Sequence, residues 1–312
     1  MRCLMDIDVS FIMTVYNKEY YLPSVLKALF AQTGLKNPEY IFVDDASTDN
    51  SVNIIKEFSK DVENVTIIAN AKNRGISART NQGIELAKGE WCRMLDSDDI
   101  LPLNSTEKML QLAKDLPADM VYGHFVKTGK EPTELENCLI EEDFTYKYNP
   151  NALMGVLAGR YTRMGQLIKT SVLKQAKGAD ERAFIQDETI PLRAAIYAKG
   201  VAKISANVVL VPKEIGNFSG NKLQLDYDRY MAYYWAIKDN TQLSEKAMRL
   251  MYIRALSAYW KFVRKTVKRP YFTKIFWRYI MAKVFKCQPD IAYLDSIYAL
   301  LAARDDIRRI KE

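Results

Sequence analysis

Apolar runs alternate with amphipathic segments through roughly the first hundred residues, and each run ends in polar side chains. The runs are rich in β-branched and aromatic residues, which predicts buried strands over 9–15, 40–43, 65–69 and 91–95. The segments between them place apolar residues on one face, which predicts helices over 20–32, 51–58 and 76–87. This alternation is typical of an α/β fold with a doubly wound, mostly parallel sheet, in which ligands bind beyond the carboxyl ends of the strands.

The fourth apolar run leads directly into three carboxylates within four positions, Asp96, Asp98 and Asp99. Hard divalent cations such as Mg²⁺ and Mn²⁺ prefer carboxylate oxygens and are commonly shared with substrate phosphates. The cluster therefore predicts a metal site. The alternative is a turn or a helix N-cap, because Asp and Ser favour such positions and Pro102 follows closely.

Polar residues also follow the second strand, as Asp44-Asp45-Ala46-Ser47-Thr48-Asp49, and Asn73-Arg74-Gly75 precedes the third helix. No Gly-x-Gly-x-x-Gly follows the first strand, and the chain contains no Gly-x-x-x-x-Gly-Lys-Ser/Thr. A bound nucleotide diphosphate would then be neutralised by a metal on the aspartates and by basic residues such as Arg74. Asp44 and Asp49 are expected to order their loop.

Four segments, 9–17, 43–49, 73–83 and 95–99, resemble in order and spacing the nucleotide-binding half of glycosyltransferase family 2. The resemblance is strong over 7–125, fainter to about 215 and absent beyond. It implies the GT-A fold, a Rossmann-like mixed, mostly parallel sheet flanked by helices. It also implies a nucleotide-sugar donor, a divalent metal cofactor (Mn²⁺ or Mg²⁺) and transfer with inversion at the anomeric carbon.

Carried over residue by residue, the resemblance assigns Thr14 and Tyr16 to the base pocket, with Tyr16 near the face of the base. Asp45 would accept a hydrogen bond from the N3–H of uracil, since a carboxylate offers only acceptors. Arg74 would lie over the base or the pyrophosphate, and Asp96 would contact the ribose or the metal.

The resemblance also assigns the metal to Asp98 and Asp99, leaving open which is the direct ligand. A general base is needed to deprotonate the acceptor hydroxyl. Asp187 matches the family's base position, and Glu188 is the alternative if the register differs by one. Both could instead simply favour a helix N-terminus. His124, the single histidine, is expected to be a strand-end or partly buried residue rather than catalytic.

The composition also indicates the compartment in which the protein is expected to act. Four scattered cysteines without metal-ligand spacing indicate a reduced compartment. No signal peptide is evident, and no run of about 18 uncharged apolar residues occurs. We therefore expect a cytoplasmic protein, at the inner face of the plasma membrane if its basic segment binds lipid.

The basic segment lies between Glu245 and Cys287, where twelve Lys and Arg residues face one acid and give a net charge of +11. The whole chain carries +7. Aromatic residues are interleaved with these cations. The segment is either a surface for anionic membrane lipid or a helical appendage whose aromatic side chains pack on the catalytic domain. No nucleic-acid partner is expected, because nothing else in the chain resembles a reader of bases.

Residues 1–215 are expected to form the catalytic domain, with a nucleotide-binding half over about 1–100 and an acceptor half over 101–215. Residues 216–312 would form a basic, aromatic-rich helical C-terminal region, with the boundary at Gly-Asn-Phe-Ser-Gly-Asn (216–221).

The predicted function is a metal-dependent inverting glycosyltransferase of the hexosyl or N-acetylhexosaminyl type. It would move a sugar from a nucleotide-sugar, with UDP as the expected nucleotide, to a hydroxyl of a glycan or lipid-linked acceptor in bacterial surface polysaccharide synthesis. Two alternatives are a non-catalytic nucleotide- or glycan-binding partner module and a nucleotidyltransferase. The second usually needs a Gly- and Lys-rich triphosphate loop, which is absent.

Overall fold

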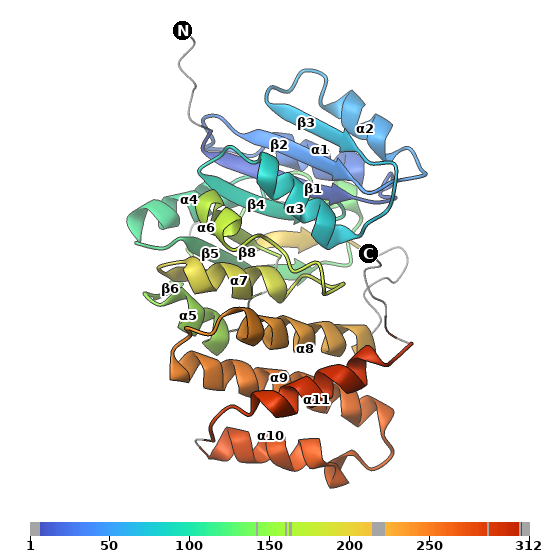
Figure 1. Ribbon diagram of the computed structural model, residues 1–312. Coiled ribbons are helices and arrows are strands. Elements are labelled where there is room, and N and C mark those ends of the chain that lie inside the picture. The colour runs from blue at the N-terminus through green and yellow to red at the C-terminus, as the bar shows by residue number, and fades with distance from the viewer. Residues whose placement is uncertain are drawn as a thin grey trace.

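A computed structural model of the chain describes residues 7–141, 143–159, 161, 164–213, 222–285, 287–305 and 307. Its strands form one sheet in the order β3-β2-β1-β4-β7-β5-β8-β6 (Figure 1). The strands are β1 (Val9–Val15), β2 (Glu39–Asp44), β3 (Val65–Ala69), β4 (Trp91–Asp96), β5 (Met120–Lys127), β6 (Tyr146–Asn149), β7 (Gln166–Lys169) and β8 (Val201–Val211).

The first four strands form as the apolar runs predict. Every residue of β1 and β2 is buried, which explains why both read as continuous apolar runs rather than as alternating ones. β1 pairs in parallel with β2 and with β4, and Thr14 lies opposite both Val43 and Asp96. The carboxyl ends of these three strands therefore meet at one edge of the sheet.

The other half of the sheet mixes strand directions. β7 lies between β4 and β5 and is antiparallel to both, and the edge strand β6 is antiparallel to β8. β5 and β8 are parallel, as are the neighbouring pairs among β1 to β4. The predicted mixed, mostly parallel α/β sheet is confirmed, although the short strand β7 was not predicted.

Helices cover both faces of the sheet. One apolar core lies under α1 (Leu22–Phe30), α2 (Ser51–Phe58) and α4 (Ser105–Asp115). The opposite face packs against α3 (Ile76–Leu86), α5 (Ala152–Ala158), α6 (Thr170–Gln175) and α7 (Thr189–Tyr197). A short 3₁₀ turn, η1 (Pro132–Leu135), follows β5.

The C-terminal region is helical and has a core of its own. It consists of α8 (Lys222–Asp239), α9 (Glu245–Thr266), the 3₁₀ turn η2 (Pro270–Phe272), α10 (Lys274–Val284) and α11 (Ile291–Ala302). These helices stack below the sheet and its covering helices (Figure 1), and their core includes Leu157 of α5 and Leu192 of α7. Within the described ranges, no helix combines the length and hydropathy that crossing a bilayer requires. The predicted boundary at 216–221 lies outside the described residues.

Candidate active site

The predicted nucleotide side of the site begins at the end of β1. Thr14 is buried, and its hydroxyl has no hydrogen-bond partner among the described residues. Tyr16, two positions on, is 44% exposed, so its ring is available to a ligand. The turn that follows is joined to the loop after β2, because the Asn17 backbone N–H donates to Ser47 and the Asn17 side chain accepts from the Thr48 N–H.

Asp45, directly after β2, is buried, and its carboxylate accepts three hydrogen bonds. The donors are the backbone N–H groups of Arg74 and Gly75, both at 2.8 Å, and Nε of Arg79 at 2.6 Å. A carboxylate has about four lone-pair directions, so these three donors leave one acceptor direction unused. Asp45 therefore holds the start of α3 against β2.

Gly75 makes this arrangement possible. Its φ of +86° lies in the region that only glycine adopts without strain, immediately before the first residue of α3. The Arg74 side chain extends outward: it is 65% exposed and lies 3.6 Å from Glu181. This position leaves its guanidinium accessible to an anionic ligand.

Asp44 and Asp49 order the loop after β2, as predicted. The Asp44 carboxylate accepts from the Ser47 N–H, and Asp49 accepts from the N–H groups of Glu19 and Ser51. The contact between Glu19 and Asp49 ties the loop after β1 to the loop after β2.

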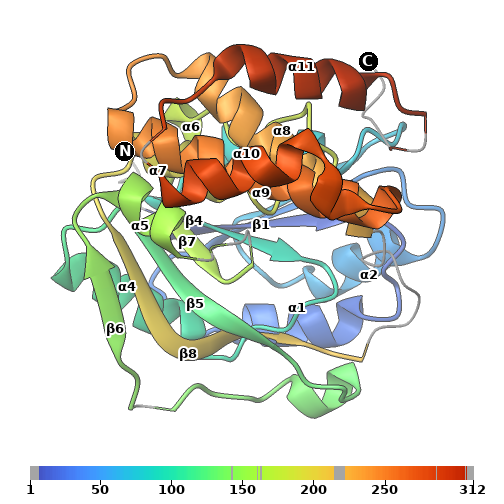
Figure 2. The ribbon, with the colours of Figure 1, turned by 90° about the horizontal axis from the view of Figure 1, so that it is seen from below.

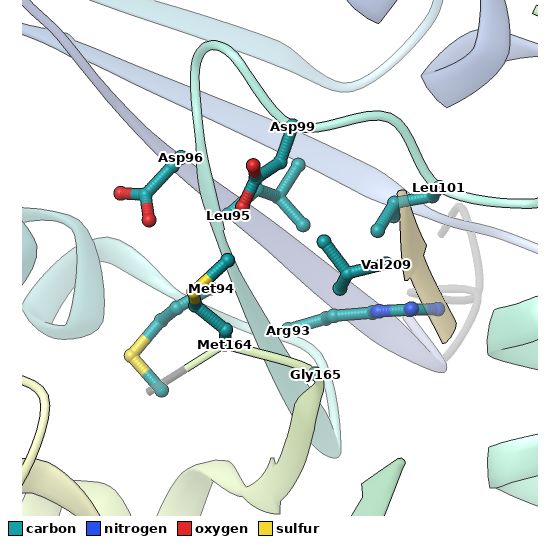
Figure 3. A pocket seen from close by; sticks show the side chains of 9 residues that line it. All are labelled: Arg93, Met94, Leu95, Asp96, Asp99, Leu101, Met164, Gly165 and Val209. Atoms are coloured by element: carbon teal, nitrogen blue, oxygen red, sulfur yellow. The ribbon is translucent and has the colours of Figure 1, made fainter. Parts of the chain in front are cut away.

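The acidic cluster divides into two parts. Asp96 ends β4 and Asp99 is buried in the following turn, where its N–H donates to the Asp96 carbonyl oxygen (3.2 Å). Both carboxylates lie beside this turn, whereas the side chain of Arg93 extends away from them beneath Val209 (Figure 3). Asp98 instead forms an ion pair with Lys18, from the loop after β1.

Asp96 and Asp99 line a cavity of about 10 Å³, together with Met94, Leu95 and Met164 among others (Figure 3). This is the space that one water molecule or one small ion needs. No set of three His, Cys, Asp or Glu side chains among the described residues is arranged to enclose a metal. Mg²⁺ is commonly held by one or two carboxylates plus substrate phosphates, so the pair fits a metal shared with a diphosphate.

The predicted base Asp187 lies in the segment before α7 and is half-buried. Its carboxylate has no hydrogen-bond or ion-pair partner within the described part of the chain. The neighbouring Glu188 differs, because its carboxylate is paired with Nε of Arg229 in α8 at 2.9 Å. The structure thus gives the two adjacent acids different surroundings.

Asp228 of α8 anchors the segment that carries Asp187. Its buried carboxylate accepts from the backbone N–H groups of Phe184 (3.0 Å) and Ile185 (3.1 Å) and from the Gln224 amide (2.9 Å). Burial raises the pKa of Asp228 to about 6, although these hydrogen bonds lower it, and the nearby Asp187 adds to the rise.

The same segment also touches the nucleotide side. Ser77, in the first turn of α3, donates to the Ala183 carbonyl oxygen at 3.3 Å. The start of α3 is in turn held by Asp45 through the Gly75 N–H. The predicted base and the predicted nucleotide contacts are therefore linked by a short chain of hydrogen bonds.

His124, the single histidine of the chain, belongs to β5. It lies within β5 rather than at a strand end and is exposed, at a register irregularity in the pairing of β5 with β8. Burial and the charge of Lys203 lower its pKa. The predicted strand-end position was wrong, because β5 continues to Lys127.

Three structural residues were not singled out from the sequence: Lys18, Arg79 and Asp228. Lys18 directly follows the polar end of the first strand, and Arg79 lies inside the segment 73–83, so position alone could have identified both. Asp228 had no such signal, because it lies 41 residues beyond Asp187 in a helix with no recognisable motif.

Solved structures share this fold. TarS 1–349 of S. aureus, in complex with UDP-GlcNAc, superimposes with a TM-score of 0.66 at 16% identity, covering 94% of this chain and 92% of that one. The mannosyltransferase PcManGT of Pyrobaculum calidifontis, with GDP-Man and Mn²⁺, has a TM-score of 0.60 at 16% identity, covering 97% of this chain and 82% of that one. The fold is that of the GT-A glycosyltransferases.

The sequence comparisons specify the family. The profile of Glycosyl transferase family 2 matches residues 10–175, more than half of the chain, and the chain belongs to this family. Glycosyltransferase GlyG of Streptococcus pneumoniae serotype 4 is 25% identical over 271 residues, covering 80% of this chain and 87% of GlyG. Poly(ribitol-phosphate) beta-glucosyltransferase of Bacillus spizizenii is 35% identical over 117 residues, covering 37% of this chain and 18% of that protein. The protein is a glycosyltransferase.

Proposed function

We propose that this glycosyltransferase transfers a sugar from a UDP-sugar to a hydroxyl of a surface-glycan or lipid-linked acceptor, with inversion at the anomeric carbon. The observation that carries the proposal is the contrast between Asp187 and Glu188. Asp187 is half-buried and has no partner among the described residues, whereas Glu188 is neutralised by Arg229. An unpaired carboxylate beside a donor site can accept a proton.

In this proposal Thr14, Tyr16 and Asp45 hold the base, and Arg74 approaches the base or the diphosphate. The exposed ring of Tyr16 and the remaining acceptor direction of Asp45 support this part. UDP is proposed as the nucleotide because a carboxylate acceptor suits the N3–H of uracil. The fold neighbour TarS has UDP-GlcNAc bound, which agrees with this choice.

Asp98 and Asp99, with Asp96 beside them, are proposed to hold a divalent metal. Such a metal, when bound, supplies positive charge that stabilises the departing nucleoside diphosphate. Since Asp98 is paired with Lys18 in this structure, its use as a ligand would require that ion pair to open. Asp96 and Asp99 already share one cavity.

The Asp187 carboxylate accepts the proton of the acceptor hydroxyl as the oxygen attacks the anomeric carbon. The new C–O bond forms on the face opposite the diphosphate, and the bond to the diphosphate oxygen breaks, which inverts the configuration. The acceptor is proposed to be a surface glycan. A relative in Bacillus subtilis is a minor teichoic acid biosynthesis protein, and another in Bacillus spizizenii is a poly(ribitol-phosphate) beta-glucosyltransferase.

The donor side is tested by thermal shift with UDP, GDP, CDP and dTDP, each with and without Mn²⁺. A ligand at 100 times its dissociation constant stabilises the folded protein by about 2.7 kcal/mol. We expect stabilisation by UDP that depends on metal. A larger shift with CDP, whose base has no N3–H, would contradict the assignment of Asp45, and a larger shift with GDP or dTDP would contradict UDP as the nucleotide.

The base is tested by Asp187→Asn, with Glu188→Gln as the matched control. We expect Asp187→Asn to keep the UDP shift and to lose transfer by a factor of about 10² or more. Glu188→Gln should lower stability slightly and keep turnover. Near wild-type turnover of Asp187→Asn, or a larger loss in Glu188→Gln, would refute the assignment.

A further inference from the structure

Helix α10 has one face in the helical core and another in solvent. Ile275 and Ala282 are 4% and 3% exposed, whereas Trp277, Met281 and Val284 are 60%, 48% and 65% exposed. Positions 277, 281 and 284 fall on one side of a helix, because side chains three and four residues apart are neighbours. The exposed face of α10 is therefore an apolar stripe.

Two further aromatic residues flank this stripe. Phe272, in η2 just before α10, is 85% exposed, and Phe285, just after it, is 55% exposed. We call these two residues with Trp277, Met281 and Val284 the α10 patch. Single exposed apolar residues are common on soluble proteins, but a helix face with several of them indicates an interaction site.

Four basic residues lie close to the α10 patch along the chain. Lys268, Arg269, Lys274 and Lys283 are all exposed. None of the four has a carboxylate partner within the described residues, whereas Arg278 on the inner side is paired with Asp290. The exposed part of α10 and the segment before it therefore combine apolar and positively charged side chains.

The α10 patch accounts for only part of the basic, aromatic segment 245–287. In α9 the comparable side chains Tyr252, Trp260 and Phe262 are buried in the helical core. The segment thus divides between two helices: α9 buries its aromatic side chains in the helical core, whereas α10 exposes Trp277. Figure 1 shows α10 at the far end of the molecule from β3, and Figure 2 views this helical end from below.

We propose that the α10 patch binds the surface of an anionic lipid membrane, independently of the transfer reaction. Trp277 and its apolar neighbours would enter the headgroup region, and the four cations would lie on lipid phosphates, as amphipathic interfacial helices do. A second copy of the chain fits less well, because a two-fold contact would oppose the same four cations. A nucleic acid also fits less well, because its phosphate backbone would gain no favourable contact from the apolar side chains of Met281 and Val284.

The test is co-sedimentation of the full chain with vesicles of phosphatidylcholine alone or of an equimolar mixture with phosphatidylglycerol. We expect binding to the mixed vesicles, weakened by salt, and a blue shift of Trp emission on binding. Each basic residue near such a surface contributes about 1 kcal/mol, or about fivefold in affinity. Lys274→Gln/Lys283→Gln should therefore weaken binding about 25-fold.

The double variant Trp277→Ser/Met281→Ser should weaken binding to the mixed vesicles at least tenfold. The matched charge control is Lys56→Gln/Lys60→Gln, which removes two exposed lysines at α2 in the sheet half. The apolar control is Leu300→Ser, at a residue 62% exposed on α11. Thermal melts establish that each variant is folded, and light scattering reports its mass.

Equal binding by the patch and control variants would overturn the proposal, as would equal binding to neutral and anionic vesicles. A dimer in light scattering that the Trp277→Ser/Met281→Ser variant converts to a monomer would also overturn it, because the patch would then bind a second copy.

Discussion

Replacing Asp228 with alanine should slow catalysis, although Asp228 lies in α8, outside the sheet. The Asp228 carboxylate accepts from the backbone N–H groups of Phe184 and Ile185, three and two residues before Asp187. The truncated side chain leaves both N–H groups without their acceptor. Because Asp228 is 2% exposed, water does not replace it without movement of the segment.

The size of the effect follows from these contacts. A buried backbone N–H without an acceptor costs about 1–3 kcal/mol, so these two part-buried groups would cost about 2 kcal/mol together, at the lower end of that range. The segment can escape this cost by moving, and a displacement of about 1 Å at a reacting group costs about 10²-fold in rate. We therefore expect kcat to fall by about 10- to 100-fold, with the nucleotide thermal shift retained.

The pH dependence gives a second signature of Asp228. Burial raises its pKa from 3.8 in the unfolded chain to about 6, so the folded protein binds this proton more tightly. Stability is therefore highest below pH 4 as far as this group is concerned, and about 3 kcal/mol is lost as the pH rises through 6 to about 7. Asp228→Ala lacks this change, so its free energy of unfolding should fall less between pH 4 and 6.

The matched control is Asp226→Ala on the same helix. Asp226 is equally buried at 2% exposure, but its carboxylate pairs with Lys265 of α9 and does not contact the base segment. Both variants should lose stability, measured by urea unfolding. Only Asp228→Ala should lose kcat well below its melting temperature. Similar kcat values for the two variants, or loss of the nucleotide shift in Asp228→Ala alone, would refute the reasoning.

Two further predictions concern ion pairs at the nucleotide side. Lys18→Met removes the cation paired with Asp98. Because a partly exposed ion pair is worth up to about 1 kcal/mol, this variant should bind Mn²⁺ up to about fivefold more tightly in calorimetry. Weaker Mn²⁺ binding would count against Asp98 as a ligand. Arg79→Met leaves the buried Asp45 carboxylate without its cation, since both side chains are 6% exposed, and should cost about 3–5 kcal/mol in urea unfolding. Arg74→Met, at a 65% exposed side chain, should cost no more than about 1 kcal/mol, and equal losses would argue against a buried pair.

The sequence predicted the strands that carry the nucleotide side. β1, β2 and β4 are continuous apolar runs because both faces of the sheet are covered, and polar residues begin where that cover ends. Parallel neighbours then bring those ends to one edge. The strand ends of Thr14, Asp45 and Asp96 could therefore be grouped from local pattern alone.

The sequence did not predict β7, whose four residues carry little periodic signal. Its position between β4 and β5 depends on pairing with residues about 45 and 75 positions away in the chain. Nor did the sequence distinguish α9 from α10, because both are basic and aromatic. Packing alone buries Trp260 in one and exposes Trp277 in the other.

The surroundings of the candidate base were decided by tertiary structure. Local sequence places two acids, Asp187 and Glu188, before a helix and does not separate their roles. Helix α8 separates them, because Arg229 pairs with Glu188 while Asp228 anchors the backbone before Asp187. Periodicity along a chain records which faces are buried. It does not record which distant side chain satisfies a buried N–H, because that depends on how helices pack after the sheet has formed.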